Sequence, residues 1–316
     1  MGPKPRRQNR KQRRAEERER QLRTGPEISY WLVAFLDLLG YRGVLDEMDV
    51  LPLPADPGGV AQITQALARA MRIRRRLHAA FEQFMKGYDL APADELQELP
   101  PDLRDLATPL RATRLVKATG PDHYVVAASL APSKLNFPMR SVYAAVVAAA
   151  SGMLIQLAMG ANDATDTLPL RGGIDIAAGA IGMPENFLYT PALTRAYLLE
   201  GSAKYPRTLI GERVVDLIEQ VLKLPNDDMR SVHARQVAER LKNMFFTDRD
   251  GKLVLDFYGP VMRETLETDF ARDIGRKAWK YATSAEQLYR QLGDQHVTEK
   301  YEWLAAYMAE RRKLWE

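Results

Sequence analysis

The first part of the chain combines short apolar runs with helically spaced apolar rows. Residues 28–37 are apolar on both faces and rich in β-branched and aromatic side chains, which predicts a central strand in a covered sheet. Apolar side chains recur every three or four residues over 60–86, the spacing of an amphipathic helix. The runs 113–119 and 123–129 flank Gly-Pro-Asp, which predicts a β-hairpin with that tripeptide at its tip.

The pattern continues with a helix, a strand and another helix. Small apolar residues over 139–160 predict a helix packed closely on the sheet. Residues 168–177 predict a strand, in which Gly172 and Gly173 indicate that another group approaches the backbone closely. Residues 191–204 predict a helix.

The last third changes in character. The stretch "RTLIGERVVDLI" predicts a short strand followed by a helix. Residues 227–316 are highly charged and largely helical in pattern, with one strand-like stretch, "GKLVLDFYG". The order β-α-β-β-α-β-α-β up to about residue 222 predicts an α+β fold with a mixed central sheet, the split βαβ, ferredoxin-like or palm arrangement. We divide the chain into a tail at 1–26, a globular domain at 27–222 and a mostly helical extension at 223–316.

Charge is concentrated in the tail. Residues 4–23 hold ten Lys or Arg and three Glu, which leaves 35 of 45 basic and 38 of 41 acidic residues for the rest of the chain. The stretch lacks an aromatic residue for base stacking. We therefore interpret it as a disordered or partly helical leader, and no nucleic-acid partner is expected.

Composition narrows the remaining classes. Hydrophobic residues make up 46% and charged residues 27% of the chain, as in ordinary globular domains. Cysteine is absent, so disulfides and thiolate zinc sites are excluded. We see no apolar run of about 18 residues, so we expect no membrane partner, and we take the cytoplasm as the compartment by default.

Asp37 is the residue that this pattern leaves unexplained. It ends an almost wholly apolar run, where a charge removed from water needs compensation. A helix N-cap is one explanation, and a metal ligand is the other. In the palm topology the end of the first strand meets the hairpin tip that carries Asp122, and two carboxylates there fit divalent cations. Asp122 alone also fits a plain turn residue.

Four blocks of sequence resemble a known family. "FLDLLG" at 35–40 and "GPDHYVVAAS" at 120–129 resemble the two metal motifs of the class III nucleotidyl cyclase superfamily, and "LRGGIDIAAG" at 170–179 resembles a later strand of that fold. "YTPALTRAYLLEGSAKYPRTLIGERVV" at 189–215 is similar to the bacterial pyrimidine cyclases of the Pycsar anti-phage system. The four blocks and "GKLVLDFYG" span roughly residues 28–260.

The resemblance implies an activity. Such enzymes convert UTP or CTP to the 3′,5′-cyclic monophosphate and pyrophosphate, and the product activates a separate effector protein in anti-phage defence. They work as homodimers with active sites at the subunit interface. We favour UTP, and the resemblance makes 27–222 the nucleotidyl cyclase catalytic domain.

The resemblance also implies site residues. Two Mg²⁺ or Mn²⁺ ions would be bound by Asp37, Asp122 and the main-chain carbonyl of Leu38. The turn 38–43, with Gly40, would offer N–H groups to phosphate oxygens. Positive charge for the departing pyrophosphate would come from a set of basic residues: Arg42, Arg171, Arg195, Lys204 and Arg207, of which we assign Arg171 and Arg195 to catalysis.

The chain departs from the purine cyclases at several positions. Thr194 and Leu198 stand where those enzymes carry an Asn and an Arg, and Phe187 stands at their adenine-reading Asp. Ala118 replaces a purine-specific Lys, with Lys117 adjacent. We assign Lys117 and Thr194 to substrate binding. These departures favour a pyrimidine; a purine cyclase, or a non-catalytic palm module that binds nucleic acid through its tail, remain the alternatives.

Two further residues receive structural assignments. Asp175 shares strand parity with Arg171, which fits a structural ion pair as well as it fits a catalytic role. Glu200 is assigned to packing and helix–sheet hydrogen bonding.

Overall fold

The computed structural model describes residues 28–49, 57–89, 115–131, 138–182, 187–266 and 268–316. The predicted basic tail at 1–26 lies outside these residues, as does the acidic, proline-punctuated connection within 90–114.

One sheet of eight strands runs through the described part of the chain. The strand order is β2-β3-β1-β4-β6-β8-β7, with β5 paired to β4. The pairs are antiparallel except β4 with β6, which is parallel. The strands are β1 (Ile28–Leu38), β2 (Leu115–Thr119), β3 (His123–Ser129), β4 (Leu170–Gly182), β5 (Phe187–Tyr189), β6 (Thr208–Ile210), β7 (Phe245–Thr247) and β8 (Leu253–Leu255). The mixed α and β class, the hairpin and the central place of β1 are confirmed.

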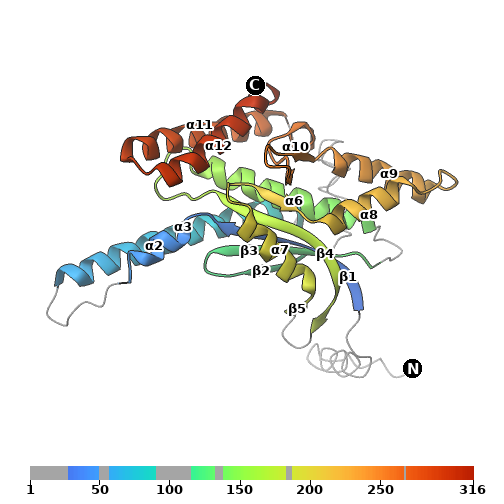
Figure 1. Ribbon diagram of the computed structural model, residues 1–316, viewed down its shortest axis with the longest axis horizontal. Helices are drawn as coiled ribbons and strands as arrows, with labels where there is room; N and C mark the ends of the chain where they lie inside the picture. The colour runs from blue at the N-terminus through green and yellow to red at the C-terminus, as the bar shows by residue number, and fades with distance from the viewer. Residues whose placement is uncertain (1–27, 50–56, 90–114, 132–137, 183–186, 267) are drawn as a thin grey trace, which may run out of the picture.

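The helices lie on both sides of this sheet (Figure 1). They are α2 (Tyr41–Asp46), α3 (Pro57–Asp89), α6 (Pro138–Met159), α7 (Pro191–Ser202), α8 (Glu212–Leu222), α9 (Met229–Lys242), α10 (Pro260–Thr265), α11 (Thr268–Leu292) and α12 (Gln295–Arg311), with a short 3₁₀ helix η1 (Arg312–Trp315). The helices predicted at 60–86, 139–160 and 191–204 are confirmed to within a few residues at each end.

The two faces of the sheet are covered by different layers. Leu36 and Leu38 of β1 belong to the large core that includes α6 and α3. Val33 and Phe35 alternate with them and pack with buried alanines of α7 on the other face. Helix α6 has the length and apolar composition of a membrane span, but 94% of its most apolar window is buried inside the fold. Its apolar surface is therefore accounted for by the core.

The glycine pair in β4 allows α7 and β1 to come close to that strand. A side chain at Gly173 would overlap the backbone of α7 at Ala196, and one at Gly172 would lie 2.5 Å from the carbonyl oxygen of Phe35. The close approach predicted from these two glycines is confirmed.

The chain beyond residue 222 completes the sheet. Strand β8 pairs with β6, and β7, which the sequence pattern did not reveal, pairs with β8. Helix α11 packs against α6. The boundary drawn at 222 stays a prediction about domains, while the sheet itself continues across it.

Candidate functional site

Asp37 lies at the end of β1, where that strand is flanked on both sides. It stands directly opposite His123 of β3 and Arg171 of β4. Strand alternation places it on the same face as Phe35, toward α7. Its side chain is 17% exposed, so the carboxyl is largely removed from water and still accessible.

The hairpin tip brings Asp122 to the same place. The backbone N–H of Leu38 donates to the carbonyl of Asp122 at 2.9 Å, which fixes the tip against the end of β1. The Asp122 carboxylate contacts Nδ1 of His123 at 3.0 Å, and the His123 ring stacks on Phe35 with centroids 4.9 Å apart. A Cβ at Gly120 would overlap that ring. The tip is thus built around the imidazole.

Arg171 and Glu200 complete this cluster. Arg171 forms an ion pair with Glu200 and lies 3.6 Å from the Asp37 carboxylate, measured from Nη2 to Oδ2. The Arg171–Glu200 contact is electrostatic, because its closest atoms do not lie in hydrogen-bonding geometry. Glu200 is buried in a row with Ala192 and Ala196 on α7. The assignment of Glu200 to packing and helix–sheet hydrogen bonding does not include this ion pair. The four-residue spacing of the buried row is the signal in the sequence that Glu200 faces the sheet.

The electrostatics of the cluster follow from three neighbouring carboxylates. Burial, helped by the negative charges of Glu200 and Asp122, raises the pKa of Asp37 to about 7, although Arg171 opposes the rise. Burial also raises the pKa of Glu200. The Asp37 and Glu200 carboxyls share a hydrogen bond. A proton is therefore held here near neutral pH, and a bound cation would compete with it.

The turn after β1 is compact and exposed. Gly40 has φ 95°, in the left-handed region that glycine tolerates, and Arg42 is exposed at the start of α2. Leu38 itself is buried at 1% exposure. These three residues follow Asp37 along the chain, and their roles toward metal and phosphate stay predictions.

Lys117 and Thr194 do not converge on the aspartates. Lys117 stands opposite Val126, which belongs to the large core on the opposite face of the sheet from Asp37. Thr194 is exposed, two residues from both Ala192 and Ala196 of the buried row of α7. The substrate-binding assignments of both residues lack support from their placement, because strand and helix periodicity turn them away.

Arg195 also lies elsewhere. Its guanidinium donates to the carbonyl of Ile176 at 3.3 Å, five residues along β4 from Arg171, or about 17 Å at strand rise. Asp175 lies in that region. Burial raises its pKa, although the N–H of Ile176 and the positive charges of Arg195 and Arg213 oppose the rise. The suggested Asp175–Arg171 ion pair is wrong, since Arg171 instead faces Asp37 and Glu200.

Arg207 lines a separate cavity, away from the aspartates. This cavity, of about 630 Å³, lies between α12 and the β7–β8 turn. Arg207 is 1% exposed and forms ion pairs with Asp248 and Asp250 of that turn. Lys204, at φ 57°, places its ammonium 5.1 Å from the centroid of the Tyr205 ring. Arg207 is therefore part of the framework and unsuited to the role of a pyrophosphate-binding cation.

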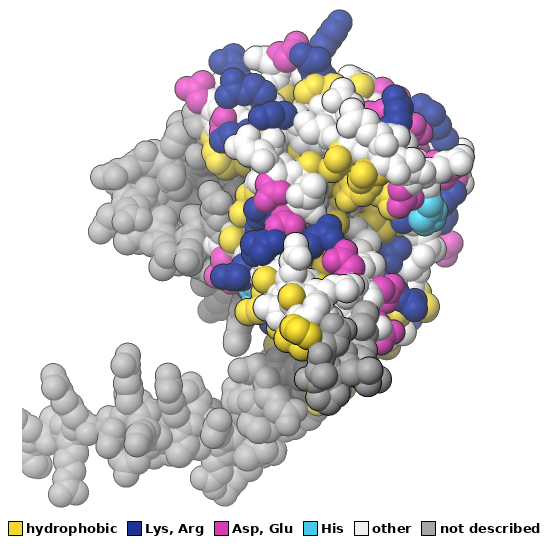
Figure 2. All heavy atoms as spheres, turned by 90° about the vertical axis from the view of Figure 1, so that its left-hand side faces the viewer, with side chains coloured by type: hydrophobic (Ala, Val, Ile, Leu, Met, Phe, Trp, Pro, Cys, Tyr) yellow, Lys and Arg dark blue, Asp and Glu magenta, His cyan; other side chains and the backbone are white. Residues whose placement is uncertain are grey.

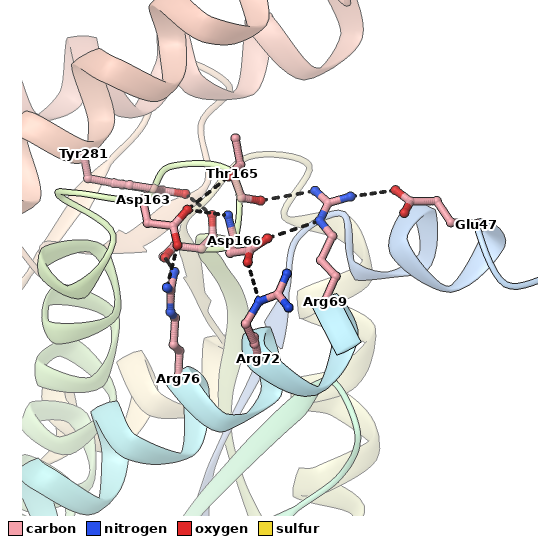
Figure 3. Close-up of polar contacts among 9 residues, drawn as sticks. Glu47, Arg69, Arg72, Arg76, Asp163, Thr165, Asp166 and Tyr281 are labelled. Atoms are coloured by element: carbon pink, nitrogen blue, oxygen red, sulfur yellow. Dashed lines mark hydrogen bonds and ion pairs between the residues drawn. The ribbon is translucent and has the colours of Figure 1, made fainter. Parts of the chain in front are cut away.

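The loop that leads into β4 is tied to α3 by an arginine ladder (Figure 3). Arg72 donates to Asp166 at 2.7 Å and Arg76 to Asp163 at 2.6 Å. From the other side, the Tyr281 hydroxyl donates to the carbonyl of Thr167 at 2.7 Å. These contacts hold the start of β4, and with it Arg171, in position.

Acidic and basic side chains are interspersed over this end of the molecule (Figure 2). Within the described ranges, no group of three or more His, Cys, Asp or Glu side chains is arranged to hold a metal ion. A two-carboxylate site that takes its remaining ligands from backbone, water and substrate phosphate is the type that Mg²⁺ uses. Asp37 and Asp122 fit that type.

Comparison with protein-family models and with curated proteins finds no match for the chain.

Proposed function

We propose that the chain is a nucleotidyl cyclase of the palm type that forms a 3′,5′-cyclic pyrimidine nucleotide from UTP or CTP. The observation that carries the proposal is the meeting of Asp37 and Asp122 at one rim of the sheet, fixed by the 2.9 Å bond from the N–H of Leu38. The strand order, with β1 between the hairpin and β4, supports the palm assignment.

The donor set supports two divalent cations, Mg²⁺ or Mn²⁺. Asp37 and Asp122 would hold them, together with the main-chain carbonyl of Leu38. Asp37 has a raised pKa because three carboxylates crowd a partly buried place, and positive charge there would relieve the repulsion. When bound, such ions lower the pKa of an attacking hydroxyl and offset charge on phosphate oxygens.

The reaction needs one bond formed and one broken. The ribose 3′-oxygen loses its proton and attacks the α-phosphorus, and the bond from that phosphorus to the bridging oxygen breaks to release pyrophosphate. The two aspartates position the triphosphate, and the exposed turn with Gly40 and Arg42 adjoins them. Arg171 holds Asp37 and Glu200 in place, a positioning role.

Base choice and biological role rest on the resemblance. Thr194 and Leu198, where purine cyclases carry Asn and Arg, are both exposed on α7, and no purine-type contact is built from them. We propose UTP as the preferred substrate, a cytoplasmic homodimer with the sites at its interface, and a cyclic product that activates a separate effector in anti-phage defence.

The test is turnover of each of the four nucleoside triphosphates with Mg²⁺ or Mn²⁺, followed by identification of the product. Wild-type chain is compared with Asp37→Ala and Asp122→Ala, and with Asp46→Asn on exposed α2 as the matched control. Cyclic UMP or CMP, lost in both alanine variants and kept in the control, supports the proposal.

Two other outcomes would replace it. Cyclic AMP or GMP would establish the purine alternative. No turnover of any triphosphate, with a nucleic-acid mobility shift that disappears when residues 1–24 are deleted, would establish a non-catalytic module.

A further inference from the structure

His123, the first residue of β3, adjoins both aspartates of the candidate site. It follows Asp122 directly in the chain and stands opposite Asp37 in the register of β1 and β3. Residues directly opposite one another in an antiparallel pair turn their side chains to the same face of the sheet. The imidazole therefore lies on the face that carries the Asp37 carboxylate.

Packing holds this imidazole in one orientation. The ring stacks on Phe35, with centroids 4.9 Å and planes 27° apart, and the Tyr197 ring of α7 meets Phe35 edge-on. The imidazole also covers Gly120, where a Cβ would lie 2.1 Å from its Cε1 atom. The N–H of Gly120 donates to the carbonyl of His123 at 3.0 Å. The ring is thus fixed independently of its contact with Asp122.

The contact between His123 and Asp122 has a defined direction. Nδ1 of the imidazole lies 3.0 Å from Oδ1 of the Asp122 carboxylate. An ionised carboxylate has acceptor oxygens and no donor, so the proton of this hydrogen bond belongs to Nδ1. This assigns the tautomer of the neutral ring, in which Nδ1 donates and Nε2 is left as an acceptor.

Asp122 needs such a partner more than Asp37 does. Its side chain is 39% exposed at the hairpin tip, and within the described ranges its second oxygen, Oδ2, makes no hydrogen bond or ion pair with the protein. Asp37 is 17% exposed and lies against Arg171. An exposed carboxylate without a partner would turn among several rotamers, and a bound cation would have to fix it at a cost in entropy. The imidazole removes that freedom in advance.

We propose that His123 is a positioning residue for the metal site, whose Nδ1–H holds Oδ1 of Asp122 so that Oδ2 is presented to a cation shared with Asp37. The inference rests on the proposed function and deepens it, because it names the residue that prepares the second aspartate. In this role the imidazole touches neither the nucleotide nor the cation. Groups that hydrogen-bond a metal ligand in this way typically contribute roughly 10- to 100-fold to metal affinity.

Two substitutions separate the hydrogen bond from the ring stack. His123→Asn keeps an N–H donor attached to Cγ, as Nδ1 is, but loses the ring. His123→Phe keeps a ring of similar shape against Phe35 and Gly120 but has no donor. The matched control is His296→Phe, the same change at an exposed histidine of α12.

The experiment titrates the full chain and its variants with Mn²⁺, read from the electron paramagnetic resonance of the free ion, at a fixed pH above the pKa of Asp37. Melting temperatures are measured in a chelator. We expect the Mn²⁺ dissociation constant to rise roughly 10- to 100-fold in His123→Phe, with its melting temperature unchanged. His123→Asn should bind Mn²⁺ as the wild-type protein does but melt about 2 °C lower, because an aromatic pair is lost. The control should match the wild-type protein in both measurements.

The outcomes separate this inference from the function on which it rests. Wild-type Mn²⁺ affinity in His123→Phe overturns the role of His123 and leaves the cyclase intact. Equal loss of affinity in the asparagine and phenylalanine variants overturns it in favour of an imidazole that binds the cation directly through Nε2. Weak binding in His123→Phe together with a lowered melting temperature overturns it in favour of a structural role. A wild-type chain that neither binds Mn²⁺ nor turns over any triphosphate overturns the proposed function itself, and the inference with it.

Discussion

Replacing Asp37 by asparagine separates the destabilising effect of this buried carboxylate from its proposed role in binding metal. Asparagine keeps the shape and can donate an N–H to Glu200, but it carries no negative charge. We predict that Asp37→Asn is more stable than the metal-free wild-type protein at alkaline pH and that it fails to bind Mn²⁺. Stabilisation at the expense of activity is expected where a site carries unfavourable charge.

The size of the effect follows from the raised pKa. Folding moves the pKa of Asp37 from 3.8 to about 7, chiefly through burial. Between these values the folded protein holds a proton that the unfolded chain has released, so the contribution of Asp37 to stability falls as pH rises through this window. A rise of about 3 pKa units corresponds to about 4 kcal/mol, reached in full above pH 7. Asparagine avoids this loss.

The assay is urea unfolding at pH 5 and pH 8 with a chelator present. The advantage of Asp37→Asn in unfolding free energy is expected to be about 2 kcal/mol at pH 5 and about 4 kcal/mol at pH 8. The exposed Asp46→Asn variant, on α2, controls for loss of one negative charge. An advantage of equal size at both pH values, or a variant less stable than wild type at pH 8, would refute the reasoning.

Adding the cation completes the comparison. Mn²⁺ at about 100 times its dissociation constant should stabilise the wild-type protein by about 2.7 kcal/mol. It should leave Asp37→Asn unchanged. Because the proton must leave before the cation binds, the affinity of the wild-type protein for Mn²⁺ should weaken as pH falls below about 7. Equal Mn²⁺ stabilisation of both proteins would show that Asp37 is not a ligand.

Three further substitutions test the framework. Glu200→Ala removes the closer of the two anions beside Arg171 and leaves only Asp37, so it should lower the unfolding free energy by about 1–3 kcal/mol in urea titrations. A smaller change would mean that Asp37 compensates Arg171 alone. Arg207→Met breaks the buried ion pairs with the β7–β8 turn and should lower the unfolding free energy by about 3–5 kcal/mol. An unchanged melting temperature would mean that water replaces the guanidinium. Gly173→Ala would overlap a backbone oxygen of α7 and should cost about 1–3 kcal/mol, whereas Gly201→Ala, with open space around it, should not.

The elements that the sequence pattern predicts well are those in which period and burial agree. The apolar run ending at Asp37 is a strand covered on both faces, and the Gly-Pro-Asp tip joins two strands whose register follows from the turn. Strand β7 escaped prediction because three residues carry too little periodicity to stand out from helical surroundings. Its place in the sheet depends on pairing with β8, a tertiary contact that no local pattern encodes.

The same distinction, between local pattern and tertiary contact, applies to the residues of the site. The two aspartates meet because both stand at the ends of strands that pair directly, a relation that topology alone dictates. The direction in which a basic side chain points depends instead on how the neighbouring elements pack around it. Arg195 and Arg171 both belong to the α7–β4 layer, yet the first donates to Ile176 and only the second reaches Asp37.

Long-range packing also decides which acids and bases act together. Glu200 reaches the cluster because two alanines and Gly173 let α7 sit close against β4. Helix α12, from the far end of the chain, is anchored to the start of β4, because the Tyr301 hydroxyl lies 3.2 Å from that of Tyr281, which donates to the carbonyl of Thr167. Removing that anchor with Tyr281→Phe should therefore lower the unfolding free energy by about 1–3 kcal/mol, because the carbonyl of Thr167 loses a buried donor, while leaving Mn²⁺ binding at Asp37 unaltered. Urea unfolding and titration with Mn²⁺ measure the two separately, and a loss of Mn²⁺ affinity in Tyr281→Phe would mean that the tyrosine pair supports the rim of the sheet at Asp37 as well as α12.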